Sequence, residues 1–201
     1  NDDFRRGKPS VHKKFTEGQA ILAGDCLHDI AFELLSNKKI HNDPKIRLEL
    51  IYLLSSAIGS KGLAGGQSLD LIFENRNIGK SKILNMYKMK TGALFGFCCK
   101  APFVIRKATN KDLNFAYKYG KIFGLIFQII DDYSDGIESF KKLGKTPGKD
   151  KKQSKSTILQ YLDNDEIIPY CKKITNQFIK QNKKQFTKWN ILSDILMDLT
   201  N

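Results

Sequence analysis

Three carboxylates stand at the end of one of the most apolar runs in the chain. Asp131, Asp132 and Asp135 close the stretch 119–135, whose first twelve residues predict a buried helix. Residues four apart share a helix face, so Asp131 and Asp135 point the same way with Asp132 beside them. Carboxylates packed this closely raise each other's pKa unless a positive group lies among them. Mg²⁺, which commonly bridges carboxylates to substrate phosphates, meets that need. A solvated acidic helix end is the alternative that this motif alone leaves open.

Several basic side chains lie in sequence contexts where they could bind an anion instead of only being solvated. Arg5 and Arg6 lie in a polar stretch near the N-terminus, and Lys90 and Thr91 interrupt an apolar helical pattern. A lysine in such a pattern either extends its ammonium group to the surface or meets an anion. Lysine and glycine are dense between residues 136 and 150, which predicts a long flexible loop.

Two adjacent glycines, Gly65 and Gly66, occur within another helical pattern. Each costs about 1 kcal/mol relative to alanine in a helix. We therefore expect the close approach of another backbone or of a ligand at this point. Gln67 and Asp70 follow three residues apart and share a helix face, so the glycines predict a crowded position beside two polar side chains.

Length and composition favour a single domain over residues 1–201. A chain of 201 residues can bury one sizeable core, and no run approaches the ~20 apolar residues of a membrane span. The four cysteines, Cys26, Cys98, Cys99 and Cys171, follow neither zinc-ligand nor disulfide spacing. We expect them to be buried free thiols in the reducing environment of the cytoplasm.

The net charge of +13 and the isoelectric point of about 9.5 admit a nucleic-acid partner, an anionic small substrate or a general bias toward lysine. The lysines are scattered rather than arranged in a stripe, which favours the compositional bias for most of the charge. No nucleic-acid partner is expected, and only the basic residues inside specific motifs bear on function.

Apolar residues recur at helical spacing through most of the chain. The patterns predict helices over residues 10–34, 48–63, 82–101, 112–135, 155–162, 167–180 and 188–199. No segment sustains the alternation expected of a strand, and no glycine-rich nucleotide-binding loop is present. These features predict an all-α, antiparallel helix bundle.

Taken together, the motifs resemble those of the trans-isoprenyl diphosphate synthases, or polyprenyl synthetases, and most closely those of bacterial farnesyl diphosphate synthases. The matching stretches are residues 3–9, 20–25, 65–71, 90–94, 127–135, 143–145 and 155–157. Each stretch is a weak signal by itself, whereas their fixed order over about three-quarters of the chain is a strong one.

The resemblance implies a fold and a reaction. The fold is the isoprenoid synthase type, an all-α bundle around a central cavity in which two facing aspartate-rich motifs hold three Mg²⁺ ions. In the reaction an allylic substrate, dimethylallyl or geranyl diphosphate, ionises, isopentenyl diphosphate attacks the allylic cation, and a proton is lost. The expected product is farnesyl diphosphate, made by a cytoplasmic homodimer.

The resemblance also implies roles for single residues. Asp131, Asp132 and Asp135 are expected to hold Mg²⁺ as the second aspartate-rich motif. The allylic diphosphate is expected to contact Arg5, Lys90, Lys155 and Lys145, and isopentenyl diphosphate to contact Arg6. Lys90, Thr91 and Gln128 are the expected catalytic residues, and the oxygens of the last two are expected to stabilise the cation. Gln67 and Asp70 are expected to support the metal site without ligating the metal.

The chain departs from the family pattern near its start. The family's first aspartate-rich motif would fall before Asn1, because Asp2 and Asp3 do not stand at its positions. We therefore expect the C-terminal two-thirds of a longer enzyme, incomplete at the N-terminus and inactive by itself. Ser154 replaces the glycine that usually precedes Lys155. The alternatives are a geranylgeranyl or longer product, a non-catalytic subunit of a heteromeric prenyl synthase, and a basic nucleic-acid-binding domain.

Overall fold

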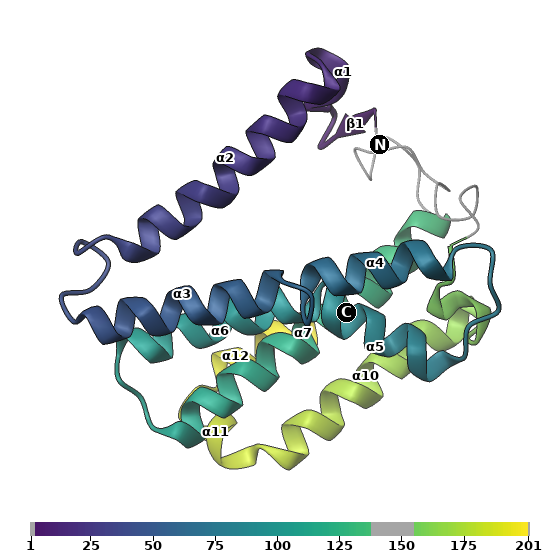
Figure 1. Ribbon diagram of the computed structural model, residues 1–201. Helices are drawn as coiled ribbons and strands as arrows, with labels where there is room; N and C mark the ends of the chain where they lie inside the picture. The colour runs from purple at the N-terminus through teal and green to yellow at the C-terminus, as the bar shows by residue number, and fades with distance from the viewer. Residues whose placement is uncertain (1–2, 138–154, 201) are drawn as a thin grey trace.

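The computed structural model describes residues 3–137 and 155–200 of the chain. The elements in order are β1 (Phe4–Arg5), β2 (Lys8–Pro9), α1 (Val11–Lys14), α2 (Glu17–Ser36), α3 (Pro44–Ile58), α4 (Leu63–Phe73), α5 (Lys80–Lys90), α6 (Gly92–Ile105), α7 (Asn110–Ile137), the short 3-10 helix η1 (Ile158–Gln160), α10 (Asn164–Gln181), α11 (Lys183–Lys188) and α12 (Ile191–Asp198). Figure 1 shows a helical bundle. The prediction of an all-α bundle is confirmed, and the two short strands pair only with each other.

The most extensive helix packing in the bundle joins α6 to α7. A Cβ atom added to Gly124 of α7 would lie 2.8 Å from the Cα atom of Gly92 of α6, so the two backbones touch where neither residue has a side chain. On another side, Ile126 and Ile129 of α7 are completely buried in one cluster with Ile83 of α5. Helix α7 is thus held on two sides, which fixes the acidic motif at its C-terminal end.

The single helix predicted over residues 82–101 is wrong, because the chain forms α5 and α6 instead. The break falls at Thr91, whose φ of −114° and ψ of −49° depart from the ordinary helical values near −63° and −42°. Its N–H still bonds to the carbonyl of Tyr87, so α5 closes normally before α6 begins at Gly92. A β-branched residue followed by glycine is a weak helix former, and that pair was the signal for the break.

The helix predicted over residues 10–34 is also divided in two. Ser10 precedes α1, but its side chain makes no capping hydrogen bond. Thr16 caps α2 instead: its Oγ1 accepts the N–H of Gln19 at 3.2 Å. Thr and Gln three residues apart are the sequence pattern of a capping box, so the start of α2 was readable from the sequence.

Helix α2 stands apart from the other long helices, which pack together (Figure 1). It has no buried residue over its 20 positions. Five of its large apolar side chains are exposed: Ile21, Leu22, Leu27, Ile30 and Leu34. Large contiguous apolar patches mark interaction sites in folded proteins.

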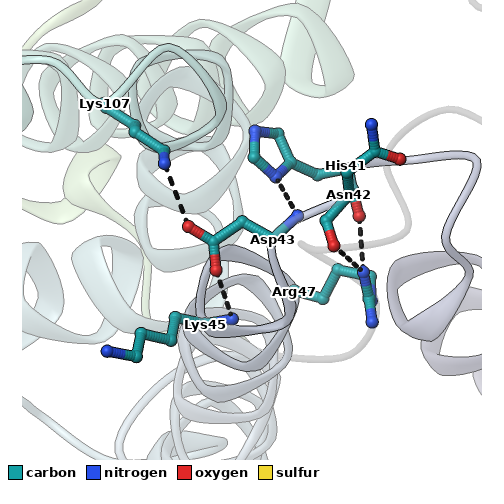
Figure 2. A network of polar contacts seen from close by, with 6 residues as sticks. All are labelled: His41, Asn42, Asp43, Lys45, Arg47 and Lys107. Atoms are coloured by element: carbon teal, nitrogen blue, oxygen red, sulfur yellow. Dashed lines mark hydrogen bonds and ion pairs between the residues drawn. The ribbon is translucent and has the colours of Figure 1, made fainter.

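A polar network fixes the start of α3 (Figure 2), which is the end of that helix away from α4 (Figure 1). Asp43 caps α3, because its Oδ1 accepts the N–H of Lys45 at 3.0 Å, and its Oδ2 lies 3.0 Å from Nζ of Lys107 at the end of α6. Arg47 donates to the carbonyl of His41 at 2.6 Å, and Nδ1 of His41 accepts the N–H of Asp43 at 3.0 Å. The network joins the α2–α3 connection to the α6–α7 turn, which is a structural role.

The cysteines differ from the prediction in part. All four are free thiols, but Cys26 and Cys98 are exposed, so the expectation that they are buried is wrong for these two. Cys171 is buried, and burial raises its pKa to about 12. The exposed position of Cys26 follows from the exposure of α2 as a whole. None of the described helices has the length and apolar character needed to cross a membrane.

Candidate active site

An ion pair joins α4 to α5. Nζ of Lys90 lies 2.6 Å from Oδ2 of Asp70, and the aspartate side chain is 7% exposed against 24% for the lysine. The two helices come this close at Gly66, where an added Cβ atom would lie 2.1 Å from the backbone nitrogen of Lys90. Of the two reasons predicted for the adjacent glycines, the structure shows the close approach of another backbone.

A second set of hydrogen bonds joins the α5–α6 junction to α7. Oγ1 of Thr91 donates to Oε1 of Gln128 at 2.6 Å, and Nε2 of Gln128 donates to Oδ1 of Asp132 at 2.8 Å. An ionised carboxylate only accepts, so Asp132 fixes the amide with its oxygen toward Thr91. The structure therefore brings together two of the expected catalytic residues and one aspartate of the acidic motif.

Tyr87 is a site residue that the sequence motifs did not indicate. Its hydroxyl group donates to Oδ2 of Asp132 and accepts the backbone N–H of Ile158 at 2.9 Å. Burial, and after it the charge of Asp132, holds the pKa of the Tyr87 phenol far above its ordinary value, so the group stays protonated at neutral pH. One feature of the sequence could have indicated Tyr87: it precedes Lys90 by three residues, and residues three apart lie on the same side of a helix.

The three aspartates of the acidic motif differ in exposure. Asp132 and Asp135 are 5% and 4% exposed, whereas Asp131 is half-buried. Among residues 3–137 and 155–200, no group of three or more His, Cys, Asp or Glu side chains is arranged to hold a metal ion. Asp131 is the most accessible of the three carboxylates.

The segment that follows Lys155 is fastened to α4 and α5. Oγ of Ser156 lies 2.8 Å from the carbonyl oxygen of Phe73 and 2.7 Å from that of Arg76. The next contact is the bond from Ile158 to Tyr87. Only a short 3-10 helix forms here, so the helix predicted over residues 155–162 is wrong. These bonds place Lys155 beside the end of α4 and next to α5.

Three expected contacts are not joined to this cluster. Arg5 and Arg6 lie in the exposed β1–β2 hairpin, where Arg6 has a φ of 52°. In the described part of the chain, no side-chain hydrogen bond or ion pair connects either arginine to α4, α5 or α7. Lys145 lies outside the described residues. Gln67 is half-buried on α4, one turn before Asp70.

Comparison with known proteins gives the same family that the motifs resemble. The polyprenyl synthetase family model matches residues 1–195. A farnesyl diphosphate synthase of Micrococcus luteus is 39% identical over 162 residues, covering 81% of this chain and 55% of the relative. A geranylgeranyl diphosphate synthase of Cyanophora paradoxa is 37% identical over 169 residues, covering 84% of this chain and 56% of the relative.

The fold matches that of solved enzymes. A geranyltransferase of Helicobacter pylori, solved with magnesium and isoprenyl diphosphate, superposes with a TM-score of 0.86 at 28% identity. The match covers 99% of this chain and 65% of the bacterial enzyme. The chain thus spans a little over half the length of the two curated relatives. On the family match and these likenesses, the chain belongs to the polyprenyl synthetase family.

Proposed function

We propose that the protein is a prenyltransferase that condenses isopentenyl diphosphate with dimethylallyl or geranyl diphosphate to give farnesyl diphosphate. One observation carries the proposal. The lysine of the Lys90–Asp70 pair and the bonded set Thr91, Gln128 and Asp132 lie at the junction of α4, α5 and α7. A cation stabilises the departing diphosphate, oriented neutral oxygens stabilise the allylic cation, and a carboxylate holds a metal ion that neutralises the diphosphate.

In this proposal Lys90 binds the diphosphate of the allylic substrate. Its ammonium group has three donors, and the bond to Asp70 uses one of them. The buried carboxylate holds the side chain in place, so the remaining donors are oriented before substrate arrives. Lys155, Lys145 and Arg5 add positive charge to the same diphosphate, and Arg6 binds isopentenyl diphosphate; these four assignments rest on the family resemblance.

Thr91 and Gln128 face the position where the allylic cation forms. Asp132 directs Oε1 of Gln128 toward Thr91, which concentrates oxygen atoms at that position. Oriented oxygen dipoles stabilise a positive charge best where water is excluded, because the local dielectric constant is low. The stabilisation of the cation by these two oxygens is therefore expected to act in the chemical step.

The acidic motif fits Mg²⁺ in its chemistry. Its donors are carboxylate oxygens, the ligands that hard cations prefer, and Mg²⁺ is commonly held by one or two carboxylates with the substrate phosphates completing its shell. In this proposal Asp131 is the foremost ligand beside Asp132 and Asp135, because it is the most exposed of the three. When bound, Mg²⁺ neutralises the charge of the leaving diphosphate. Three ions per site remain a prediction.

We propose that the protein acts as a homodimer through α2. The exposed apolar side chains of that helix support the proposal, since a self-complementary interface would cover them. Sedimentation of the full-length protein, with Leu27→Glu as the disrupting variant, tests it; an unchanged mass for wild type and variant would contradict it. A cytoplasmic location stays a prediction.

The reaction is tested on the full-length protein with Mg²⁺, isopentenyl diphosphate and either dimethylallyl or geranyl diphosphate. The products are dephosphorylated and separated by chain length. A fifteen-carbon product is expected. A twenty-carbon or longer product would correct the product and keep the reaction class. The absence of any prenyl product would contradict the proposed activity and favour a non-catalytic subunit.

A further inference from the structure

Building on the proposed function, we propose that Tyr87 is a positioning residue of the diphosphate site. It holds the carboxylate of Asp132 in one orientation and thereby sets the geometry of the acidic motif on α7. Nothing in the motifs assigns this residue a role, and its place on α5 lies 45 positions from its partner in the chain.

The environment of Tyr87 gives its hydroxyl group a single favourable arrangement. The residue is 2% exposed. A buried hydroxyl group without partners costs about 1–3 kcal/mol, so both of its functions must be satisfied. The N–H of Ile158 occupies a lone pair of the phenol oxygen at 2.9 Å. The backbone N–H of Ile158 is a donor and cannot accept a hydrogen bond. The phenol O–H therefore donates to the carboxylate of Asp132.

Asp132 is held from two sides as a result. Its Oδ2 accepts from Tyr87, and its Oδ1 accepts from Gln128 at 2.8 Å. Asp132 is 5% exposed, so water does not readily replace either donor. A carboxylate clamped at both oxygens cannot rotate about its side-chain bonds without losing a charge-assisted hydrogen bond.

The clamp acts on the rest of the motif through the backbone of α7. Asp131 adjoins Asp132, so tilting the end of α7 would shift the more accessible carboxylate as well. Groups that orient a metal ligand from outside the ligand shell typically change metal affinity or activity 10–100-fold when removed. Tyr87 therefore controls how well the site binds a magnesium-associated diphosphate without touching that ligand.

The test compares two buried tyrosines. Tyr87→Phe removes one hydroxyl group beside the motif, and Tyr119→Phe removes one that donates to the carbonyl of Leu192 at 3.0 Å. Tyr119 is 4% exposed, so both variants remove a hydroxyl group from a buried tyrosine; Y119F loses one hydrogen bond to a carbonyl, whereas Y87F loses the bonds to Asp132 and Ile158. Binding of inorganic diphosphate to the full-length protein with Mg²⁺ is measured by isothermal titration calorimetry, below the melting temperature of each variant.

Y87F is expected to weaken diphosphate binding by about tenfold, and Y119F by less than about twofold. Equal affinities for the two variants and the wild type would overturn the inference, because Tyr87 would then be a structural residue only. If the wild-type protein itself bound no diphosphate, the proposed function would fail, and this inference with it. Diphosphate binding by the wild type therefore distinguishes a failure of the inference about Tyr87 alone from a failure of the proposed function.

A double-mutant cycle with Asp132→Asn tests whether Tyr87 acts through Asp132. In the D132N background, Y87F is expected to cost little further affinity; a second full tenfold loss would contradict the inference. If Y87F does not fold, Gln128→Met decides the question, because it removes the hydrogen bond from Gln128 to the other oxygen of Asp132 and leaves Tyr87 in place. An affinity unchanged by Q128M would then overturn the clamp.

Discussion

Lys90 reaches back from the end of α5 to Asp70 on α4, and its ammonium nitrogen lies 2.6 Å from the carboxylate oxygen. The carboxylate of Asp70 is the more deeply buried partner, and the ammonium group of Lys90 is the more exposed one. An arrangement of this kind lets a second anion bind the lysine while the first stays in place, because an ammonium group has several donors.

Removing the cation is predicted to cost both stability and activity. Lys90→Met leaves the buried Asp70 carboxylate without its partner, which should lower the free energy of unfolding by about 1–3 kcal/mol. The double variant D70N/K90M should regain most of that stability, since no buried charge remains, but none of the activity. Urea denaturation and turnover of geranyl diphosphate measure the two effects. A double variant as unstable as K90M would show that the pair does not explain the loss.

Asp131→Ala is predicted to lower turnover by orders of magnitude and to leave the melting temperature nearly unchanged. Asp131 is the accessible carboxylate of the motif, so its loss removes a metal ligand without opening a cavity in the core. Asp165→Asn, an exposed acidic residue at the start of α10, is the control. Wild-type turnover in D131A would show that the metal assignment on α7 is wrong.

Two glycine substitutions are predicted to have opposite signs. In Gly66→Ala the new Cβ atom would lie 2.1 Å from the backbone nitrogen of Lys90, so α4 and α5 must separate; such overpacking costs about 1–3 kcal/mol or more. Gly24→Ala on α2 meets nothing within 4 Å and should stabilise by about 0.5–1 kcal/mol. Thermal unfolding measures both. A neutral G66A would mean that the helices are not in backbone contact.

The ion pair between Asp112 on α7 and Lys188 on α11 predicts a pH dependence of stability. Nζ of Lys188 lies 2.9 Å from Oδ2 of Asp112, and this bond holds the pKa of the aspartate below its ordinary value. The unfolded chain therefore binds a proton at a pH where the folded chain does not. The contribution is full above the ordinary aspartate pKa, near 3.9, and is lost as the pH falls through the lowered value.

Asp112→Asn tests this directly through urea denaturation between neutral pH and about pH 2.5. The wild type is predicted to be more stable than D112N at neutral pH, and the difference should shrink only below about pH 4. A difference that stays constant down to the lowest pH would show that the carboxylate does not titrate with a lowered pKa.

The sequence predicted the parts of this molecule that local patterns determine. The apolar spacing of α3, α7 and α10, and the positions of Asp70, Lys90 and Asp131 on helices, follow from residues a few positions apart. The family could also be recognised, because its motifs keep their order along the chain. Both kinds of information lie in short stretches that can be read without knowing the tertiary structure.

Contacts between segments that are distant in the sequence could not be predicted from these local patterns. The bond between Tyr87 and Asp132 depends on how α5 packs against α7, and the two residues are 45 positions apart in the sequence. The Thr-Gly pair was a local signal for the break at Thr91, but the hydrogen bond from Thr91 to Gln128 could not be predicted. The exposure of α2 could not be predicted for a related reason. Periodicity shows that a helix has an apolar face, but it does not show which element covers that face.

The most direct test of the site is a crystal structure of the full-length protein with Mg²⁺ and an unreactive analogue of an allylic diphosphate. The predicted result places the diphosphate within hydrogen-bond distance of Nζ of Lys90, with a metal ion between it and Asp131, while Asp132 keeps its bonds to Tyr87 and Gln128. A diphosphate bound away from Lys90, or a metal ion with no ligand on α7, would contradict the account.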